Sequence, residues 1–309
     1  MTRILITGAG GLVGRALLQE LIRHQVIATD LTAPDLPANA RFRRMDVTGD
    51  DPAQVIAQEQ PEVVIHLASV VTPPKGSTRR MEYAVDVTGT RNVLAACVAQ
   101  GVRRLVVTSS GAAYGYHPRN ATPLTEDMPL QGNPEFSYSR HKHLVEQMLA
   151  ETRAAHPDLQ QVVLRVGTVL GPGVENQITA LFRRKRLLRV AGTDGAFVFI
   201  WAGDLARILH RAATDGPPGI YNVAGDGALP IADLATILRK PVLTLPAWVL
   251  RLALGVARPL GLTRYGPEQV RFLQYRPVLD NTRLKTVFGY TPHRTTRQAF
   301  TDWAQGAGL

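Results

Sequence analysis

The chain has 309 residues, of which 45% are hydrophobic and 19% charged, a composition typical of a globular protein rather than a disordered one. This length suits one large domain or two smaller domains that share a core. The single cysteine, Cys97, excludes a disulfide framework and a cysteine-based zinc site, and we expect no metal site. The opening residues, MTRILITGAG, show no signal-peptide pattern, so we expect a reducing, cytoplasmic location.

The formal net charge is +10, which favours an acidic partner such as nucleic acid, a membrane surface or an acidic small molecule. The densest basic run is LFRRKRLLRV at 181–190, and no known nucleic-acid-binding motif accompanies it. We interpret this run as a solvated helix face in preference to a ligand site. We therefore expect a small-molecule substrate and no nucleic acid partner.

The first half of the chain alternates short apolar runs with amphipathic segments. Near-continuous apolar strands separated by helices predict a parallel sheet covered on both faces, a doubly wound Rossmann-type α/β fold. The predicted strands are 3–7, 25–30, 41–47, 62–69, 103–110 and 160–167, and the long helices are 81–100 and 136–155.

The pattern loosens after about residue 168, where GPG breaks the alternation. We predict a helix at 174–190, short strands at 196–201 and 219–225 around a helix at 203–214, and a mostly helical remainder. The resulting division is a cofactor domain at 1–167, to which 196–225 returns, and a substrate-binding lobe at 168–195 and 226–309. The apolar stretch 246–262 is too short and too charged to span a bilayer, and we expect a packed helix or, as the alternative, an amphipathic surface helix.

TGAGGLVG follows the first strand and opens the first helix, as a dinucleotide-binding loop requires. Gly8 allows the tight turn, Gly10 or Gly11 lets backbone N–H groups approach a pyrophosphate, and Gly14 lets the helix pack on the strand. Asp30 ends the second strand, where a carboxylate accepts from both ribose hydroxyls of NAD and repels the 2′-phosphate of NADP. The predicted cofactor is therefore NAD.

Strand five ends in VVTSSGAAYG, and FSYSRHKHL opens the helix at 136–155. Ser110 lies at the carboxyl edge of the sheet, which faces the ligand crevice. Tyr138 and Lys142 are four residues apart and share one helix face. An ammonium beside a phenol lowers its pKa, so Tyr138 can exchange a proton with a substrate hydroxyl near neutral pH.

These motifs, together with HLAS, DVTGTRNVL, LRVGTVLGPG and IYNVAG, resemble the extended short-chain dehydrogenases/reductases over residues 1 to about 225. The stretch 113–142 is similar to the UDP-glucose 4-epimerase-like branch in particular. The resemblance implies a catalytic set of Ser110, Tyr138 and Lys142. It implies cofactor contacts from Gly8, Gly10, Gly11, Leu12, Val13, Gly14, Asp30, Leu31, Asp46, Val47, Leu67, Ala68, Ser69, Thr108, Tyr138, Lys142 and Val166.

Some positions depart from the family pattern. Asp86 stands where the family usually has Asn, and an ionised Asp accepts hydrogen bonds but cannot donate them. Arg140 and His141, between Tyr138 and Lys142, are interpreted as solvent-facing spacers. Asp204 is interpreted as a helix cap.

Family resemblance leaves the reaction open. Gly111 and Ala112 occupy positions where dehydratases of the family carry an acid–base pair, so dehydration by that route is disfavoured. The favoured hypothesis is epimerisation of a nucleotide sugar with transient hydride abstraction by bound NAD. The alternatives are a dehydrogenase or reductase of an alcohol or ketone with a sterol- or flavonoid-type substrate, and, from another class, a non-catalytic dinucleotide sensor.

The predicted substrate contacts are fewer, because the lobe carries the least motif information. A nucleotide sugar needs cations for its pyrophosphate. The candidates are Ser110, Asn176, Arg184 and Arg264, with Arg183 and Arg271 as further cations. The resemblance also implies a homodimer that pairs through the helices at 81–100 and 136–155.

Overall fold

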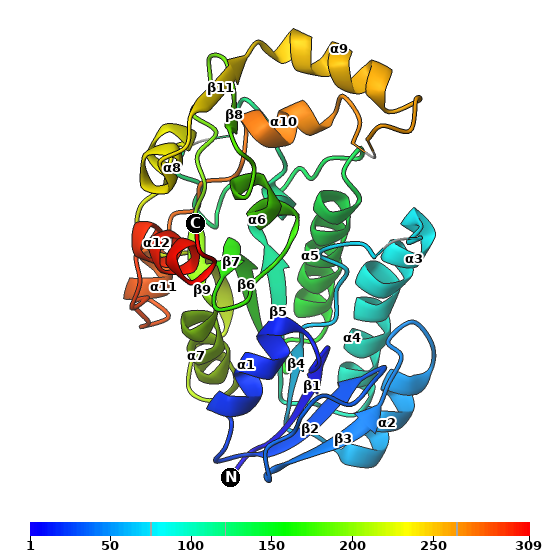
Figure 1. The fold of residues 1–309 in the computed structure, drawn as a ribbon. Coiled ribbons are helices and arrows are strands. Elements are labelled where there is room, and N and C mark those ends of the chain that lie inside the picture. The colour runs from blue at the N-terminus through cyan, green and yellow to red at the C-terminus, as the bar shows by residue number, and fades with distance from the viewer. Residues whose placement is uncertain (75, 121, 264) are drawn as a thin grey trace.

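A seven-stranded parallel sheet forms the centre of the protein in the computed structural model, which describes residues 1–74, 76–120, 122–263 and 265–309 (Figure 1). The strand order is β10-β6-β5-β4-β1-β2-β3, which confirms the predicted doubly wound Rossmann-type fold. The order reverses between β1 and β4, so the carboxyl ends of these strands flank a ligand crevice. The strands are β1 Arg3–Thr7, β2 Gln25–Asp30, β3 Ala40–Arg44, β4 Val63–His66, β5 Arg104–Ser110, β6 Gln160–Val166 and β10 Gly219–Val223.

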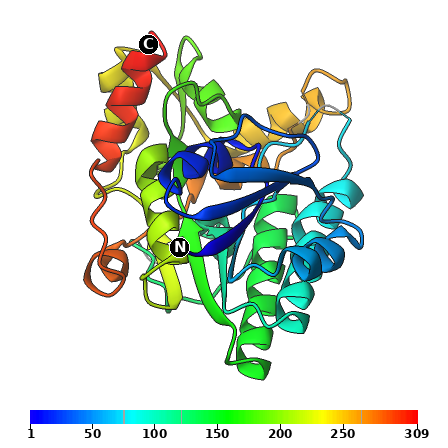
Figure 2. The ribbon, with the colours of Figure 1, turned by 90° about the horizontal axis from the view of Figure 1, so that it is seen from below.

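Side chains that alternate along the strands divide the core into two apolar layers. In β1, Ile4 and Ile6 belong to one layer and Leu5 to the other. Figure 2 shows helices on both sides of the sheet. Helices α1 Leu12–Glu20 and α7 Ala202–Ala213 contribute to the first layer, and α2 Asp51–Glu59, α4 Gly89–Ala99 and α5 Ser137–Ala155 contribute to the second. Cys97 lies in the second layer, where burial raises the pKa of its thiol to about 12, so this cysteine serves as a small packed residue.

The helix predicted at 81–100 is not continuous. It comprises α3 Arg79–Tyr83, a π-helical turn η1 at Ala84–Thr88, and α4. A π-helical turn shifts the side chains that it carries relative to a regular helix, and such turns are frequent at functional sites. Asp86 lies in this turn and is buried.

The prediction of one helix at 174–190 is wrong. Helix α6 spans only Gln177–Phe182, and the end of the basic run forms the strand β8 at Leu187–Val190, which pairs with β11 at Val242–Leu245. Leu187 and Val190 are buried. Apolar packing in the lobe therefore determines the strand conformation at the end of the basic run, where the sequence pattern predicts a solvated helix face.

The C-terminal lobe is built from short elements around aromatic side chains. Strand β7 (Thr168–Leu170) pairs with β9 (Phe199–Trp201), and Phe182, Phe199, Phe300 and Trp303 pack together in this region. The lobe helices are α8 Ile231–Leu238, α9 Ala247–Ala257, α10 Gln269–Gln274, α11 Thr282–Thr286 and α12 Thr296–Gly306. Among the described helices, none combines the length and apolar character that crossing a bilayer requires.

Several segments after residue 200 lie with the main sheet: α7 packs against α1, β10 pairs with β6 as an edge strand, and α11 packs against β10. The interpretation of Asp204 as a helix cap is wrong. Its buried carboxylate accepts from Tyr290 Oη at 2.8 Å and from the His293 backbone N–H at 2.9 Å. Asp204 therefore fastens the chain near the C-terminus to α7.

Candidate active site

The glycine loop has the geometry that its sequence predicts. Gly8 has φ +70°, and a Cβ there would lie 2.8 Å from the backbone nitrogen of Ala68. A Cβ at Gly14 would lie 2.6 Å from the carbonyl oxygens of Gly8 and Ala9. Helix α1 begins after Gly11 without a side-chain cap, so its first N–H groups are available to an anion.

Asp30 lies over this loop. Its carboxylate accepts from the backbone N–H of Gly10 at 2.9 Å and from that of Leu31 at 2.7 Å. These bonds fix the carboxylate beside the helix N-terminus, and a carboxylate has further lone pairs that can receive ribose hydroxyls. The loop, the uncapped helix and this carboxylate together fit a dinucleotide such as NAD.

The remaining predicted cofactor positions divide by exposure. Asp46 is half-buried and accepts from the backbone and side chain of Thr48, and these two bonds lower its pKa although burial opposes them. Val47 is buried against Gly89, where a Cβ would come within 2.6 Å of it. Leu12 and Leu31 are exposed beside the loop; Val13, Leu67, Ala68, Ser69 and Thr108 are half-buried; and Val166 is buried at the end of β6. Contact of these residues with NAD stays a prediction.

A chain of buried hydrogen bonds joins the strand ends beneath the loop. Thr7 Oγ1 lies 2.7 Å from His66 Nδ1, and His66 Nε2 lies 3.0 Å from Thr90 Oγ1. Because Thr90 donates its hydroxyl to the Asp86 carbonyl and Thr7 accepts from Leu67 and Ala68, His66 accepts at Nδ1 and donates at Nε2. Burial, and next the charge of Lys142, lower the pKa of His66 to about 3, so this ring is neutral.

The three predicted catalytic residues lie at the carboxyl edge of β5 and on the first turns of α5. Lys142 donates from Nζ to the Thr108 carbonyl at 2.9 Å, and its Nζ lies 5.5 Å from the centroid of the Tyr138 ring. Ser110 accepts from the Ala112 backbone N–H at 3.1 Å. The strand end thus fixes the ammonium close to the tyrosine. The catalytic roles themselves remain predicted.

The interpretation of His141 as a solvent-facing spacer is wrong, whereas Arg140 is exposed as expected. His141 is buried and lies with Nδ1 2.9 Å from Asp86 Oδ2. Asp86 also accepts from the Ser69 hydroxyl and the Val70 backbone N–H. Burial raises the pKa of Asp86, but the bond from His141 and the charge of Lys142 outweigh it and lower that pKa. The Asp that departs from the family pattern therefore has a matched partner on α5.

A buried ion pair behind the site was not predicted from the sequence. Glu146, one turn beyond Lys142, accepts two bonds from Arg165 Nε and one from Arg165 Nη2 at 2.7 Å. Ser109 also donates to Glu146, at 2.5 Å. The pair ties α5 to β5 and β6, so it fixes the helix that carries Tyr138 and Lys142. The spacing of Tyr138, Lys142 and Glu146, four residues apart in turn, could have placed Glu146 on the face of α5 that carries the site, but no local pattern pointed to Arg165 on β6.

Most predicted substrate residues have structural partners. Asn176 caps α6 by accepting from Ile178 and Thr179, Arg183 pairs with Glu175 at 3.0 Å, and Arg271 pairs with Glu135 at 2.9 Å. These three side chains therefore have partners within the chain, and their contact with a substrate stays a prediction. Arg184 is exposed after α6, and Arg264 lies outside the described residues.

Arg276 is the cation that the sequence did not single out. Its guanidinium lies 3.6 Å from the centroid of Phe197 and donates to the Gly195 carbonyl at 2.6 Å. Its Nε is buried without a partner, and no carboxylate of the described chain pairs with it. Burial lowers the pKa of Arg276 to about 9, which leaves it charged at neutral pH. Tyr116 is buried, and this burial raises its pKa. It lies close enough to Tyr138 and to Arg276 to interact electrostatically with both.

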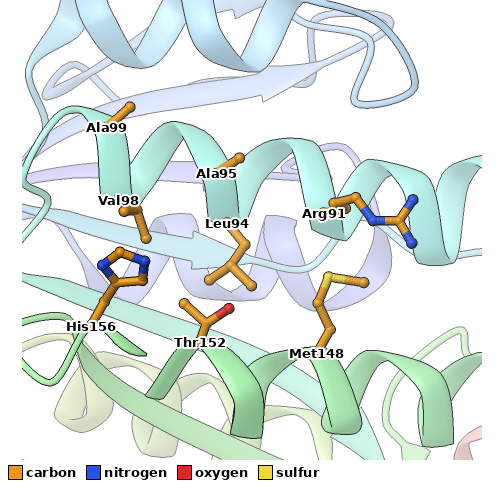
Figure 3. A pocket seen from close by; sticks show the side chains of 8 residues that line it. All are labelled: Arg91, Leu94, Ala95, Val98, Ala99, Met148, Thr152 and His156. Atoms are coloured by element: carbon orange, nitrogen blue, oxygen red, sulfur yellow. The ribbon is translucent and has the colours of Figure 1, made fainter. Parts of the chain in front are cut away.

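A groove between the outer faces of α4 and α5 lies away from this chemistry (Figure 3). Its lining includes Leu94 and Val98 from α4 and Met148 and Thr152 from α5. None of Ser110, Tyr138 and Lys142 borders it. The groove lies on the two helices that the sequence analysis predicts as a dimer interface.

The fold and the placement of these residues define the class: an extended short-chain dehydrogenase/reductase. A model of the NAD dependent epimerase/dehydratase family matches residues 4–224. The chain belongs to this NAD-dependent enzyme family, whose cofactor is the one predicted.

Relatives in sequence and structure agree with this assignment. The chain is 28% identical over 319 residues to the uncharacterized protein Rv0501 of Mycobacterium tuberculosis, covering 99% of the chain and 84% of that protein. It is 24% identical to 3beta-hydroxysteroid-dehydrogenase/decarboxylase isoform 2 of Arabidopsis thaliana, covering 93% of the chain and 58% of that protein.

Two solved structures share the fold. The enzyme WbmG of Bordetella bronchiseptica, in complex with NAD, superposes with a TM-score of 0.76 at 21% identity, over 99% of this chain and 94% of WbmG. UDP-glucose 4-epimerase of Thermotoga maritima, with UDP-glucose, gives 0.76 at 20% identity, over 99% and 98% of the two chains.

Proposed function

We propose that the protein is an NAD-dependent epimerase that acts on a nucleotide sugar. The observation that carries this proposal is Arg276, a half-buried, charged guanidinium with a buried Nε, close to Tyr116 and without a carboxylate partner among the described residues. A buried cation without a counter-ion is costly, and the phosphate of a nucleotide supplies the missing charge. Structural neighbours crystallised with UDP-glucose support this substrate class.

The residues at the sheet edge would handle the proton. Tyr138 takes the proton from the sugar hydroxyl as the carbinol is oxidised, and returns it when the ketone is reduced on the other face. Lys142, held by the Thr108 carbonyl, stabilises the phenolate, and Ser110 orients the substrate oxygen. When bound, NAD supplies a reversible hydride acceptor.

The first experiment is to denature the purified protein gently and measure the absorbance and mass of what it releases. Stoichiometric NAD or NADH supports a retained cofactor, and interconversion of UDP-glucose and UDP-galactose is the matching activity assay. If the purified protein holds no NAD and is inactive on every nucleotide sugar tested, the proposal is contradicted.

The second candidate is a dehydrogenase or reductase of an alcohol or ketone with NAD as a released cosubstrate. The resemblance to the Arabidopsis 3beta-hydroxysteroid-dehydrogenase/decarboxylase favours it. Weak, reversible NAD binding and turnover of apolar alcohols would support it over epimerisation. A non-catalytic sensor is disfavoured because Ser110, Tyr138 and Lys142 are all retained.

We also propose that two copies pair through α4 and α5. The groove between these helices has apolar lining from both, including the half-buried side chains of Val98 and Met148 (Figure 3). In a two-fold dimer the same surface of each copy would cover this groove. Light scattering that shows a monomer at micromolar concentration would contradict the proposal. The cytoplasmic location and the two-domain division remain predictions.

A further inference from the structure

Helix α9 is apolar on both sides, although the protein covers only one of them. Leu250 is buried and Leu254 half-buried against the lobe. Trp248, Leu252 and Val256, at every fourth position of the opposite face, are 67%, 63% and 54% exposed. A helix that is apolar all round is expected to be buried on all sides.

The exposed apolar surface continues beyond the helix. Leu260 is 66% exposed and Leu262 is 77% exposed. With Trp248, Leu252 and Val256, these residues form one surface segment, which we call the α9 face. Figure 1 places α9 at the outer margin of the C-terminal lobe, far from the N-terminus and from β3. Apolar exposure concentrated in this way marks an interaction site.

The net charge of the protein is concentrated in the same lobe. Residues 176–193 and 234–267 carry ten Lys and Arg and no Asp or Glu. Removing these ten from the 35 Lys and Arg of the chain leaves 25, which equals the 25 Asp and Glu. The whole formal charge of +10 therefore resides in two segments that contain no acid.

The fold brings these two segments together, because β8 from the first pairs with β11 from the second. Strand β11 leads directly into α9. Arg251 is exposed on α9 beside Trp248 and Leu252, and Arg258 follows the helix with only a 3.6 Å contact to Glu268. Two arginines thus lie beside the exposed apolar side chains, and the strand that leads into α9 pairs with the end of the basic run.

We propose that the α9 face docks on an anionic membrane surface. Apolar side chains interleaved with arginine are what an interfacial helix uses, since the former enter the acyl boundary and the latter bind lipid phosphates. A tryptophan is suited to the depth of the headgroups. A second copy of the chain fits less well, because a two-fold contact would bring like charges together. Nucleic acid would not require exposed leucine and valine.

The test uses the full chain and vesicles of phosphatidylcholine, either pure or mixed with phosphatidylglycerol. Flotation should recover the protein with the mixed vesicles and not with the pure ones, and added salt should release it. Tryptophan emission should shift to the blue on binding, and this shift should be lost in a Trp248→Phe variant, because Trp303 is buried and Trp201 half-buried.

Two variants address the α9 face directly: Trp248→Ser combined with Leu252→Ser, and Arg251→Glu. Each should weaken binding to mixed vesicles by roughly tenfold or more. The matched controls are Ile22→Ser and Arg23→Glu, which change exposed residues after α1 with the same chemistry and should bind as the parent does. Thermal melting of every variant checks that the fold is retained.

Several results would overturn the proposal. One is no binding to mixed vesicles, and another is equal loss in the α9 variants and the matched controls. A third is binding that persists in the α9 variants and disappears only when Arg183 to Arg186 are neutralised, because the basic run would then act without α9. A fourth is self-association that Trp248→Ser abolishes while vesicle binding is absent, which would assign the α9 face to a second copy.

Discussion

The carboxyl edge of the sheet and the C-terminal lobe treat polar and apolar groups differently. At the sheet edge, His66, Asp86 and Glu146 are buried, and each has its hydrogen bonds completed within the chain. In the lobe, Arg276 has no carboxylate partner among the described residues, and the apolar side chains of the α9 face are exposed. Buried polar side chains whose hydrogen bonds are all made within the chain hold the sheet edge rigid, as catalysis requires. Charged or apolar groups without a partner in the chain indicate where other molecules would bind.

The largest expected effect comes from Tyr138→Phe, which removes the only hydroxyl proposed to carry the substrate proton. We expect turnover to fall by about 10²- to 10⁴-fold with little change in NAD binding, because Lys142 remains bound to Thr108. Steady-state kinetics and NAD titration measure the two quantities. Tyr83→Phe, a partly exposed tyrosine on α3, is the control. Turnover that survives in Tyr138→Phe would refute the proposed mechanism.

The rigidity of the platform can be tested at Glu146. Glu146→Ala leaves Arg165 charged and buried, and should lower the free energy of unfolding by about 3–5 kcal/mol. Urea denaturation measures the loss. Glu175→Ala breaks the exposed pair with Arg183 and should change stability by less than about 1 kcal/mol. Similar losses in the two variants would mean that burial does not distinguish the pairs.

Arg276 tests the lobe as the substrate site. Arg276→Met preserves much of the side-chain volume and should weaken UDP-sugar binding by roughly 10- to 100-fold, the value of a lost charge-assisted bond. Calorimetry gives the affinity. Arg23→Met, at an exposed position after α1 and outside every predicted site, is the control and should bind as the parent does. Unchanged binding in Arg276→Met would remove the observation on which the proposed function rests.

A smaller effect is expected in the pH dependence of stability. His66 has a folded-state pKa of about 3 against 6.5 in the unfolded chain. Between these values the unfolded state binds one more proton, so the free energy of unfolding falls as pH falls, by up to about 1.4 kcal/mol per pH unit. Above the unfolded-state pKa of His66 both states bind the same number of protons, so this pH dependence of the free energy of unfolding vanishes. His66→Gln should show a shallower slope in urea titrations below that pH, and an identical slope would show that His66 is not the titrating group.

The local sequence pattern was sufficient to predict features that depend only on neighbouring residues. TGAGGLVG needed only a strand before it and a helix after it, and Gly8 and Gly14 occupy places where a Cβ would collide with backbone. Tyr138 and Lys142 share a face because a helix dictates it. The predicted helix at 174–190 failed because buried Leu187 and Val190 pair in a sheet with residues more than fifty positions later, which no local window contains.

The sequence by itself determined the Rossmann-type fold, because periodicity and loop spacing are properties of neighbouring residues. The resemblance of its motifs indicated the family and pointed to Ser110, Tyr138 and Lys142. Only the tertiary structure decided that His141 is buried against Asp86, that Arg276 has no carboxylate partner in the described part of the chain, and that two acid-free segments meet at β8 and β11. Each of these three features depends on residues distant in the sequence, because the neighbours of a side chain in the folded chain determine its burial and its charge partners.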